Sequence, residues 1–361
     1  MNDKEINTIM GNIQNNLLTF IEKEDDTEEN FQDLNKLFDE NQITENHYLF
    51  NSLLHLITNI GNNSYRCSNF FDKLFKIILL LKTPIKQSFS NSQIFNIFQS
   101  NKRLLLFLIE EEMLTIDGYI LKRILKDESM KLRYSQYFIP EIGHLIKTRN
   151  KNKKEINDEF YIKRRIGEND DYICQLIRKD SIKEFLIYIN KNNYSINNKI
   201  NTSCFETNQL LIEKQVNLIE YAAFFGSIQI FKYLHLNGID ITPSLMSFAI
   251  HGKNIEIIHL IEERFTKDIS YYDCFKESIK CHHNDFANYF MNNYLDYGKI
   301  EKSFDIFINC LKYHNFVFLN TFFISQSSLY YLCIYDYPYF ISSLLKGNFI
   351  DMNHVRILNI F

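Results

Sequence analysis

The stretch NLIEYAAFFGSIQIFKYLHLNGIDI, residues 217–241, decides the fold of this chain. It predicts two short helices, roughly 218–225 and 228–236, with a break at Gly226 and Ser227. Apolar side chains of the second helix recur near the helical period, which indicates one buried stripe. This stripe comprises Ile228, Phe231, Leu234 and Leu236.

The unit formed by these two helices is too short to fold alone. Gly238 follows the second helix, where the chain enters the left-handed region that glycine adopts without a Cβ penalty. Ala222 and Ala223 leave room for a neighbouring helix to approach closely. Because such a pair cannot bury its own apolar face, we expect it to stack on further copies of itself.

Degenerate copies of the unit follow along the chain. The small residue Ala222 has equivalents at steps of 27, 29, 32 and 22 residues. These equivalents are Ala249, Ser278, Cys310 and Leu332. An apolar second helix follows each of them at a similar distance. A helix pair repeated with a mean period just under 30 residues predicts a helical solenoid.

The composition supports an all-α fold. The chain has 361 residues, of which 45% are hydrophobic and 23% charged, as in folded globular proteins. Its 10 Gly and 4 Pro are too few for the many tight turns of a β-sandwich or barrel. A formal net charge of −4 provides no global basic field, so nucleic acid is an unlikely partner on this ground.

The pattern divides the chain into three regions. Residues 1–146 predict an N-terminal helical lobe of degenerate repeats, and 171–361 predict the repeat solenoid. Residues 147–170 lose the apolar period and form a charged linker or helix. Within the solenoid, the irregular stretch from Asn193 to Val216 predicts an insertion or long loop.

The basic segment 147–165 has two interpretations. It could bind RNA or an anionic membrane surface. However, it carries no aromatic stacking platform, and acidic residues interleave with the basic ones. A solvated linker or a charged helix is therefore the favoured reading.

Signals for export or membrane insertion are not found in the sequence. The N-terminus shows no signal-peptide pattern, and the longest apolar run, Leu74 to Leu81, is far short of the roughly 20 residues that span a bilayer. The seven Cys are scattered without paired spacing. We therefore expect reduced thiols, no transmembrane segment and a cytoplasmic location.

The repeat resembles the ankyrin repeat. Residues 222–226 are similar to its Ala-Ala-x-x-Gly centre, and residues 233–240 to its Leu-Leu-x-x-Gly-Ala-Asp end. Thr242 and Pro243 resemble the Thr-Pro start of the next unit, with Thr as helix cap and Pro in the first helical position. Later units depart from the family by losing this start and the helix-ending Gly.

The whole chain more closely resembles a large group of ankyrin-like proteins of anaerobic protists, known as a domain of unknown function. Three runs carry this resemblance: SCFETN (203–208), LIEYAAFFGSIQIFKYL (218–234) and CFKESIKCHHNDFANY (274–289). The resemblance implies a non-enzymatic ankyrin-like scaffold for protein–protein interaction, without a cofactor.

One cluster has residue types that bind zinc. Cys274, Cys281, His282 and His283 form C-x6-C-H-H. Zinc sites use closer Cys pairs with four converging ligands, so a buried Cys and two surface His at a repeat break are the favoured reading. The chain also lacks G-x-S-x-G, a P-loop and G-x-G-x-x-G, so we expect neither catalytic residues nor a metal.

Stacked repeats would align the residues that follow the Ala-Ala position into one partner-binding stripe. Aromatic and cationic side chains occupy these positions, and aromatic anchors dominate many interfaces. The candidates are Phe224, Phe225, His251, Lys280, Lys312, Tyr313 and Tyr335. For the two Phe, packing on the neighbouring repeat is an equally good reading.

The C-terminal units are rich in aromatic residues, and the last half unit, Asn353 to Phe361, ends on Ile360-Phe361. A solenoid needs a polar terminal cap. Either these residues fold back as a cap, or a partner or a second copy covers them.

Overall fold

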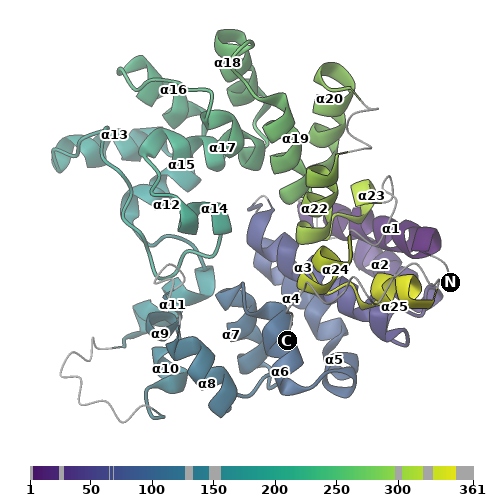
Figure 1. Ribbon diagram of the computed structural model, residues 1–361. Helices are drawn as coiled ribbons and strands as arrows, with labels where there is room; N and C mark the ends of the chain where they lie inside the picture. Colours follow the sequence, from purple (N-terminus) through teal and green to yellow (C-terminus); the bar gives the residue numbers. More distant parts are fainter. Residues whose placement is uncertain are drawn as a thin grey trace. The chain divides into compact units, whose positions relative to one another are not determined.

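The computed structural model describes residues 3–23, 28–64, 66–67, 69–126, 133–145, 156–296, 303–319 and 328–346. Over these residues the fold is all-α, as the sequence predicts, with one isolated bridge between Lys199 and Asn217 (Figure 1). The chain divides into two compact units. The terminal unit comprises 1–59, 67–74 and 271–361, and the central unit comprises 60–66 and 75–270.

The helices of the central unit lie between α5 and α18. They are α5 (Lys82–Ser88), α6 (Asn91–Phe98), α7 (Lys102–Glu110), α8 (Gly118–Leu125), α9 (Tyr134–Tyr137), α10 (Ile139–Ile142), α11 (Asp158–Ile166), α12 (Tyr172–Arg178), α13 (Ile182–Lys191), α14 (Gln209–Glu213), α15 (Leu218–Phe224), α16 (Ile228–Leu236), α17 (Leu245–Gly252) and α18 (Ile255–Phe265). Two further helices, α3 (His47–Asn63) and α4 (Phe70–Leu80), have residues in both units.

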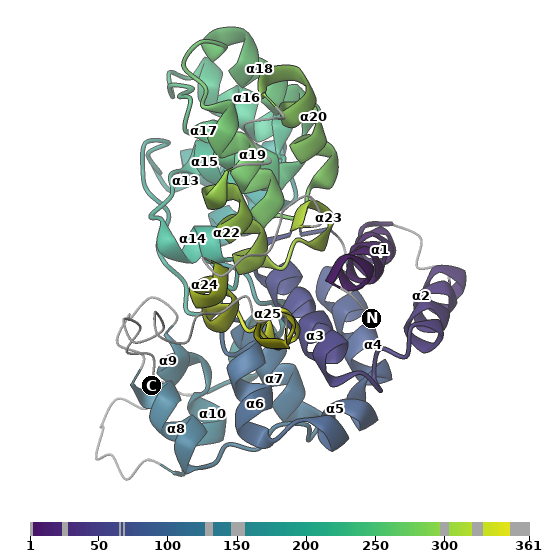
Figure 2. The same ribbon diagram turned by 45° about the vertical axis from the view of Figure 1, so that its right-hand side comes forward.

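The terminal unit combines helices from both ends of the chain. They are α1 (Asp3–Glu22), α2 (Glu28–Glu40), α19 (Tyr271–Lys280), α20 (Asn284–Tyr294), α22 (Phe304–Tyr313), α23 (Phe316–Leu319), α24 (Leu329–Ile334) and α25 (Pro338–Lys346). Figure 2 shows α1 beside α23, and the two helices pack together. This division does not follow the sequence order used for the predicted regions 1–146, 147–170 and 171–361.

Helix pairs stack in the central unit, as the 217–241 stretch predicts. The first helices α12, α15 and α17 contact one another in order, and the second helices α13, α16 and α18 do the same (Figure 1). Phe231 of α16 and Ile258 of α18 are both buried in these adjacent pairs. In the terminal unit, α19, α22 and α24 form a second row of contacting first helices.

One backbone conformation recurs at the break of six helix pairs and confirms the predicted register. The residue four positions after each small residue has a positive φ. These residues are Asp180 (46°), Gly226 (68°), Lys253 (51°), His282 (60°), His314 (52°) and Asp336 (59°). Asp and His tolerate this region better than most residues, which explains how the later units fold without the glycine.

The same break closes with the same backbone hydrogen bond. The N–H after the positive-φ residue donates to the carbonyl of the small residue, as in a Schellman motif. This bond is 2.9 Å from Ser227 to Ala222, 2.9 Å from His283 to Ser278 and 3.0 Å from Asn315 to Cys310. The repeat is therefore defined by backbone geometry, while its side chains vary.

Side chains at the break also bond three of the repeats to the preceding one. Ser227 Oγ donates to the carbonyl of Ile177 at 2.6 Å. Asn315 Nδ2 donates to the equivalent carbonyl of Ile279 at 3.0 Å. Tyr337 Oη donates to that of Leu311 at 3.0 Å. Different residue types thus satisfy the same orphan carbonyl at the end of a first helix.

Two local predictions are wrong. Leu236, the last residue of α16, is 83% exposed, and Ile230 is buried in the stripe instead. Thr242 and Pro243 do not begin a helix: α17 starts at Leu245, whose N–H donates to Thr242 O at 3.0 Å. These two residues form the turn that precedes α17.

Candidate binding pocket and its buried support

A pocket of about 200 Å³ lies in the central unit, beside the segment that the sequence predicts as an insertion. Its walls come from this segment, which includes α14, from α15, and from the turns before α9 and α12. The lining residues are Arg133, Asn169, Ile200, Asn201, Thr202, Ser203, Glu206, Leu211, Ile212, Lys214, Val216 and Tyr221. The insertion is thus structured by one helical turn and by its packing on neighbouring repeats.

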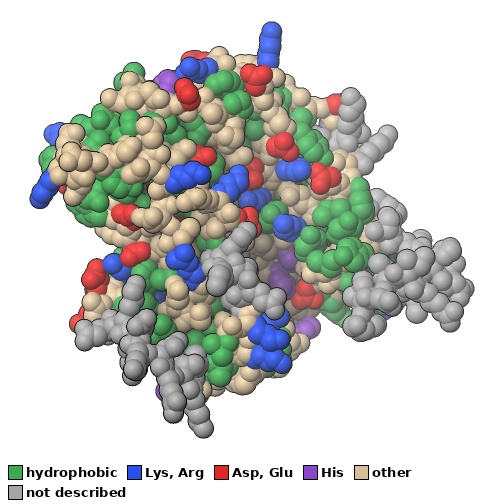
Figure 3. Space-filling view, turned by 60° about the vertical axis from the view of Figure 1, so that its left-hand side comes forward, with side chains coloured by type: hydrophobic (Ala, Val, Ile, Leu, Met, Phe, Trp, Pro, Cys, Tyr) green, Lys and Arg blue, Asp and Glu red, His purple; other side chains and the backbone are tan. Residues whose placement is uncertain are grey.

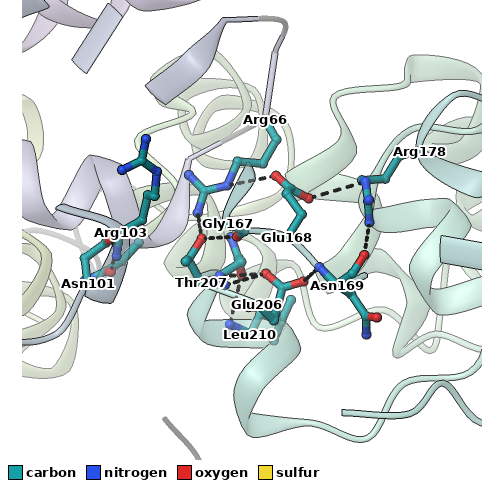
Figure 4. A network of polar contacts seen from close by, with 12 residues as sticks. Arg66, Asn101, Arg103, Gly167, Glu168, Asn169, Arg178, Glu206, Thr207 and Leu210 are labelled. Carbon is teal, nitrogen blue, oxygen red and sulfur yellow. Dashed lines mark hydrogen bonds and ion pairs between the residues drawn. The ribbon is translucent and has the colours of Figure 1, made fainter. Parts of the chain in front are cut away.

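The Glu206 carboxylate holds the insertion in place. It is only 4% exposed, and its Oε1 accepts hydrogen bonds from the N–H groups of Thr207 (2.9 Å) and Asn208 (2.8 Å). Its Oε2 accepts from the N–H of Asn169 at 3.2 Å (Figure 4). Because three backbone donors surround this charge, it stabilises the chain and has little capacity left for a ligand.

Arg178, which does not line the pocket, donates hydrogen bonds to Asn169 and Tyr221. Arg178 Nη1 donates to Asn169 O and to Tyr221 Oη, both at 2.8 Å. Asn169 Nδ2 donates to Asn201 O at 2.8 Å, and Asn169 Oδ1 accepts from the N–H of Asp171 at 3.0 Å. The polar groups in the interior of the pocket therefore already form hydrogen bonds with one another.

Glu168 lies in the same network but does not line the pocket. Its carboxylate is 3.8 Å from Arg66 Nε and 3.7 Å from Arg178 Nε (Figure 4). Burial, together with the charge of Glu206, raises the pKa of Glu168 to about 7, although both Arg oppose this shift. Such a pKa suits proton transfer, but the place of Glu168 behind the wall favours a structural role.

The surface left for a ligand is apolar with a basic edge. Ile200, Leu211 and Val216 are buried side chains of the wall. Arg133 is half-buried and donates to Thr202 Oγ1 at 2.6 Å, whereas Lys214 is exposed with its Nζ 5.1 Å from the Phe248 ring centroid. The arrangement can bind an apolar group and a nearby anion.

The predicted stripe residues divide by helical position. Those two residues after the small residue are mostly buried: Phe224 and His251 stack on each other at 4.9 Å, and Lys280 is 9% exposed with its Nζ 3.0 Å from Glu277. Lys312 holds the same position and is exposed. Phe224 therefore faces the next repeat, which agrees with the packing alternative for this residue.

Residues three positions after the small residue keep part of their surface. Phe225, Tyr313 and Tyr335 are half-buried and lie at equivalent positions of three repeats. Phe225 contacts the Arg178 guanidinium at 5.9 Å, and the Lys312 ammonium lies 5.2 Å from the Tyr313 ring. The partner-binding role of the seven residues stays a prediction.

Part of the basic segment 147–165 lies outside the described residues. In the described part, each cation of α11 is paired with a carboxylate. Lys163 is 2.9 Å from Glu159, Arg164 is 2.7 Å from Glu141, and Arg165 is 3.2 Å from Glu110; these residues form a charged helix.

The cluster considered for zinc lies around the turn between α19 and α20. Cys274, Cys281, His282 and His283 are all buried, so the expectation of two surface His is wrong. The half unit Asn353 to Phe361 lies outside the described residues.

Sequence reasoning missed the pocket. The SCFETN run carries the resemblance and contains Glu206, but nothing local indicates that Asn169, Arg133 or Lys214 meet beside it. The sequence signal that could have pointed to the pocket is the acidic residue Glu206, which lies within a run of apolar and hydroxyl side chains.

Comparisons with known proteins give a family match over part of the chain. No curated protein and no solved structure matches the chain. No helix among the described residues has the length and hydropathy needed to cross a bilayer. Residues 236–325, which include α17 to α22, match a family described as a domain of unknown function (DUF3447).

Proposed function

We propose that this protein is a non-enzymatic, ankyrin-like scaffold that binds a protein partner. The observation that carries the proposal is the shared register of the helix pairs. Since the breaks of six helix pairs have the same backbone conformation, we expect equivalent side chains of stacked pairs to recur along one surface in each unit. A repeated surface of this kind suits recognition of another chain.

The central pocket supports the proposal. Polar groups inside the pocket are held by three backbone amides and by Arg178, so they keep the wall rigid. Rigid, preformed pockets lower the entropic cost of binding. The half-buried Phe225 lies on the same helix end as Tyr221 and adds an aromatic edge.

Binding to RNA or to an anionic membrane through 147–165 is the competing function. The described cations of this segment are neutralised by carboxylates. Basic and acidic side chains are also interspersed on the face shown in Figure 3. Both observations favour a protein partner.

Proximity labelling with the full-length chain in its source cell, followed by reconstitution from two purified proteins, tests the proposal. We expect a stoichiometric complex that survives nuclease and an increase of NaCl from about 0.1 to about 0.5 M. A contact driven by phosphates would lose several orders of magnitude of affinity over this range. Recovery of RNA or vesicles without any reconstituted protein complex would refute the proposal.

A further inference from the structure

The central pocket has the size of a single side chain and cannot enclose a cofactor. Its volume is about 200 Å³, whereas pockets for drug-sized ligands and cofactors have about 300–1,000 Å³. It is open to one side and is lined by Ile200, Leu211 and Val216 together with the ring of Tyr221. An aliphatic or small aromatic side chain would remove this apolar wall from water.

The polar groups of the pocket determine what can accompany that side chain. Glu206 accepts three hydrogen bonds and Asn169 donates and accepts within the same network, so little of their capacity is left for a polar ligand in the interior. The ionic groups left with capacity are Arg133 and Lys214. Among the described residues, neither forms an ion pair with a carboxylate: Arg133 donates to Thr202, and Lys214 lies over the Phe248 ring.

Nearby carboxylates are engaged elsewhere. Asp170 accepts from Ser203 Oγ at 2.7 Å and lies 3.1 Å from Lys163 Nζ. Glu213 accepts from Gln209 Nε2 at 2.7 Å. The two cations therefore form a positive edge beside an apolar hollow, and their charge is complementary to an anion that arrives with an apolar group.

We infer that the pocket takes an apolar side chain of a partner polypeptide whose adjacent carboxylate pairs with Arg133 and Lys214. This inference rests on the proposed function and specifies the chemistry of the partner. The carboxylate has two sources: an Asp or Glu beside the apolar residue, or the C-terminus of a chain that ends on it. Arginine binds both sources through the same two-pronged geometry.

Two peptide arrays of random sequence distinguish these sources. One array is anchored by its C-termini and offers only side-chain carboxylates, and the other is anchored by its N-termini and offers free C-termini. The full-length protein is applied to both. The best peptides are then measured in solution by fluorescence anisotropy.

Arg133→Glu combined with Lys214→Glu is the test variant, and circular dichroism verifies its fold. Lys183→Glu combined with Lys191→Glu is the matched control, because these exposed cations lie on α13, outside the pocket. Arg133→Lys with Lys214→Arg keeps the charges. In the test variant we expect the affinity to fall by about tenfold or more, which is equivalent to about 1.4 kcal/mol. In the control variant and in the charge-retaining variant we expect little change.

Enriched peptides should share an apolar residue next to a carboxylate, and the array that retains them identifies its source. The inference is overturned when neither array retains peptides, or when the retained peptides lack a carboxylate or bind the test variant unchanged. A reconstituted protein complex that is insensitive to the test variant would overturn the inference alone and leave the proposed function intact.

Discussion

Replacement of Asn315 by Ala should destabilise the terminal unit more than any comparable loss of a single hydrogen-bonding residue there. Asn315 is fully buried at the break between α22 and α23. Its Nδ2 donates to Ile279 O at 3.0 Å and to Asn284 Oδ1 at 3.1 Å. Its Oδ1 accepts from Gln14 Nε2 of α1 at 3.0 Å. One side chain thus joins two repeats and the N-terminal helix.

The magnitude follows from the partners left behind. Gln14 is itself fully buried, and the Ile279 carbonyl ends a buried helix, so water does not replace Asn315 readily. Each buried polar group without a partner costs about 1–3 kcal/mol. Two such groups give about 2–6 kcal/mol, whereas Asn284 is half-buried and can turn to solvent. We expect a loss of about 4 kcal/mol.

Urea unfolding followed by circular dichroism measures the total change, and hydrogen exchange of α1 and α23 peptides locates it. Asn309→Ala is the matched control. The Asn309 side chain is half-buried in the same unit and donates a single bond, to Lys276 O at 2.9 Å. Its removal should cost about 1 kcal/mol.

The double variant Gln14→Leu with Asn315→Leu separates the bond from its surroundings. When both partners of the Gln14–Asn315 bond become apolar, neither side chain is left as an unpaired buried polar group. The Ile279 carbonyl loses its partner whenever Asn315 is replaced, and the Phe316 N–H loses its partner whenever Gln14 is replaced, in the single and double variants alike. The double variant should therefore be more stable than the sum of the two single changes by more than about 0.5 kcal/mol, the usual limit of additivity. Additive effects, or an Asn315→Ala loss no larger than that of Asn309→Ala, would refute this account.

Four further substitutions test the backbone and the buried titratable groups, each by urea unfolding. Gly226→Ala should lower the free energy of unfolding by more than about 2 kcal/mol, because φ is +68° and a Cβ would come within 2.6 Å of the Gly252 carbonyl oxygen. Lys253→Gly, at φ +51°, should be neutral or stabilising. Equal effects of the two substitutions would contradict this geometric argument. Burial lowers the pKa of His282 from 6.5 to about 4, so the unfolded chain takes up the proton first and about 3 kcal/mol of stability is lost as pH falls through this window. His282→Asn, which tolerates the positive φ, should flatten that slope, and an unchanged slope would exclude His282 as its cause. Glu168 has a pKa raised to about 7, so stability should fall as pH rises from about 4.5 to 7, and Glu168→Gln should remove this fall. Persistence of the fall in the variant would show that Glu168 is not its cause.

Local features of the sequence predicted the helix pairs well. The second helix of the 217–241 stretch is observed at Ile228–Leu236, between the Gly226 break and the Asn237-Gly238 end. The spacing of Ala222, Ala249, Ser278 and Cys310 predicted the register, because a short side chain at the closest approach of two first helices is a local requirement of packing. Leu332 holds the equivalent buried position with a larger side chain.

Side-chain direction and long-range contacts could not be predicted in the same way. Phe224 and His251 were placed in the correct register, but a turn of about 200° from the small residue points both side chains between neighbouring repeats, where they stack on each other. Arg133 and Lys214 lie far apart in sequence and share the pocket because α9 and α14 belong to one folded unit. No periodicity carries that information.

The recurring break also explains how such a degenerate repeat keeps one geometry. The positive-φ position holds Gly in one of six helix pairs of the described chain, so the conformational cost of a positive φ at the other residues must be offset by other contacts. The next residue meets it by bonding to the preceding repeat, through a hydroxyl in Ser227, an amide in Asn315 and a phenol in Tyr337. Three side chains of different length therefore reach equivalent carbonyls while the backbone register is retained. Among the described residues, the half-buried Phe225, Tyr313 and Tyr335 make no side-chain hydrogen bond of this kind to the preceding repeat, so we expect their positions to tolerate more change than that of Asn315.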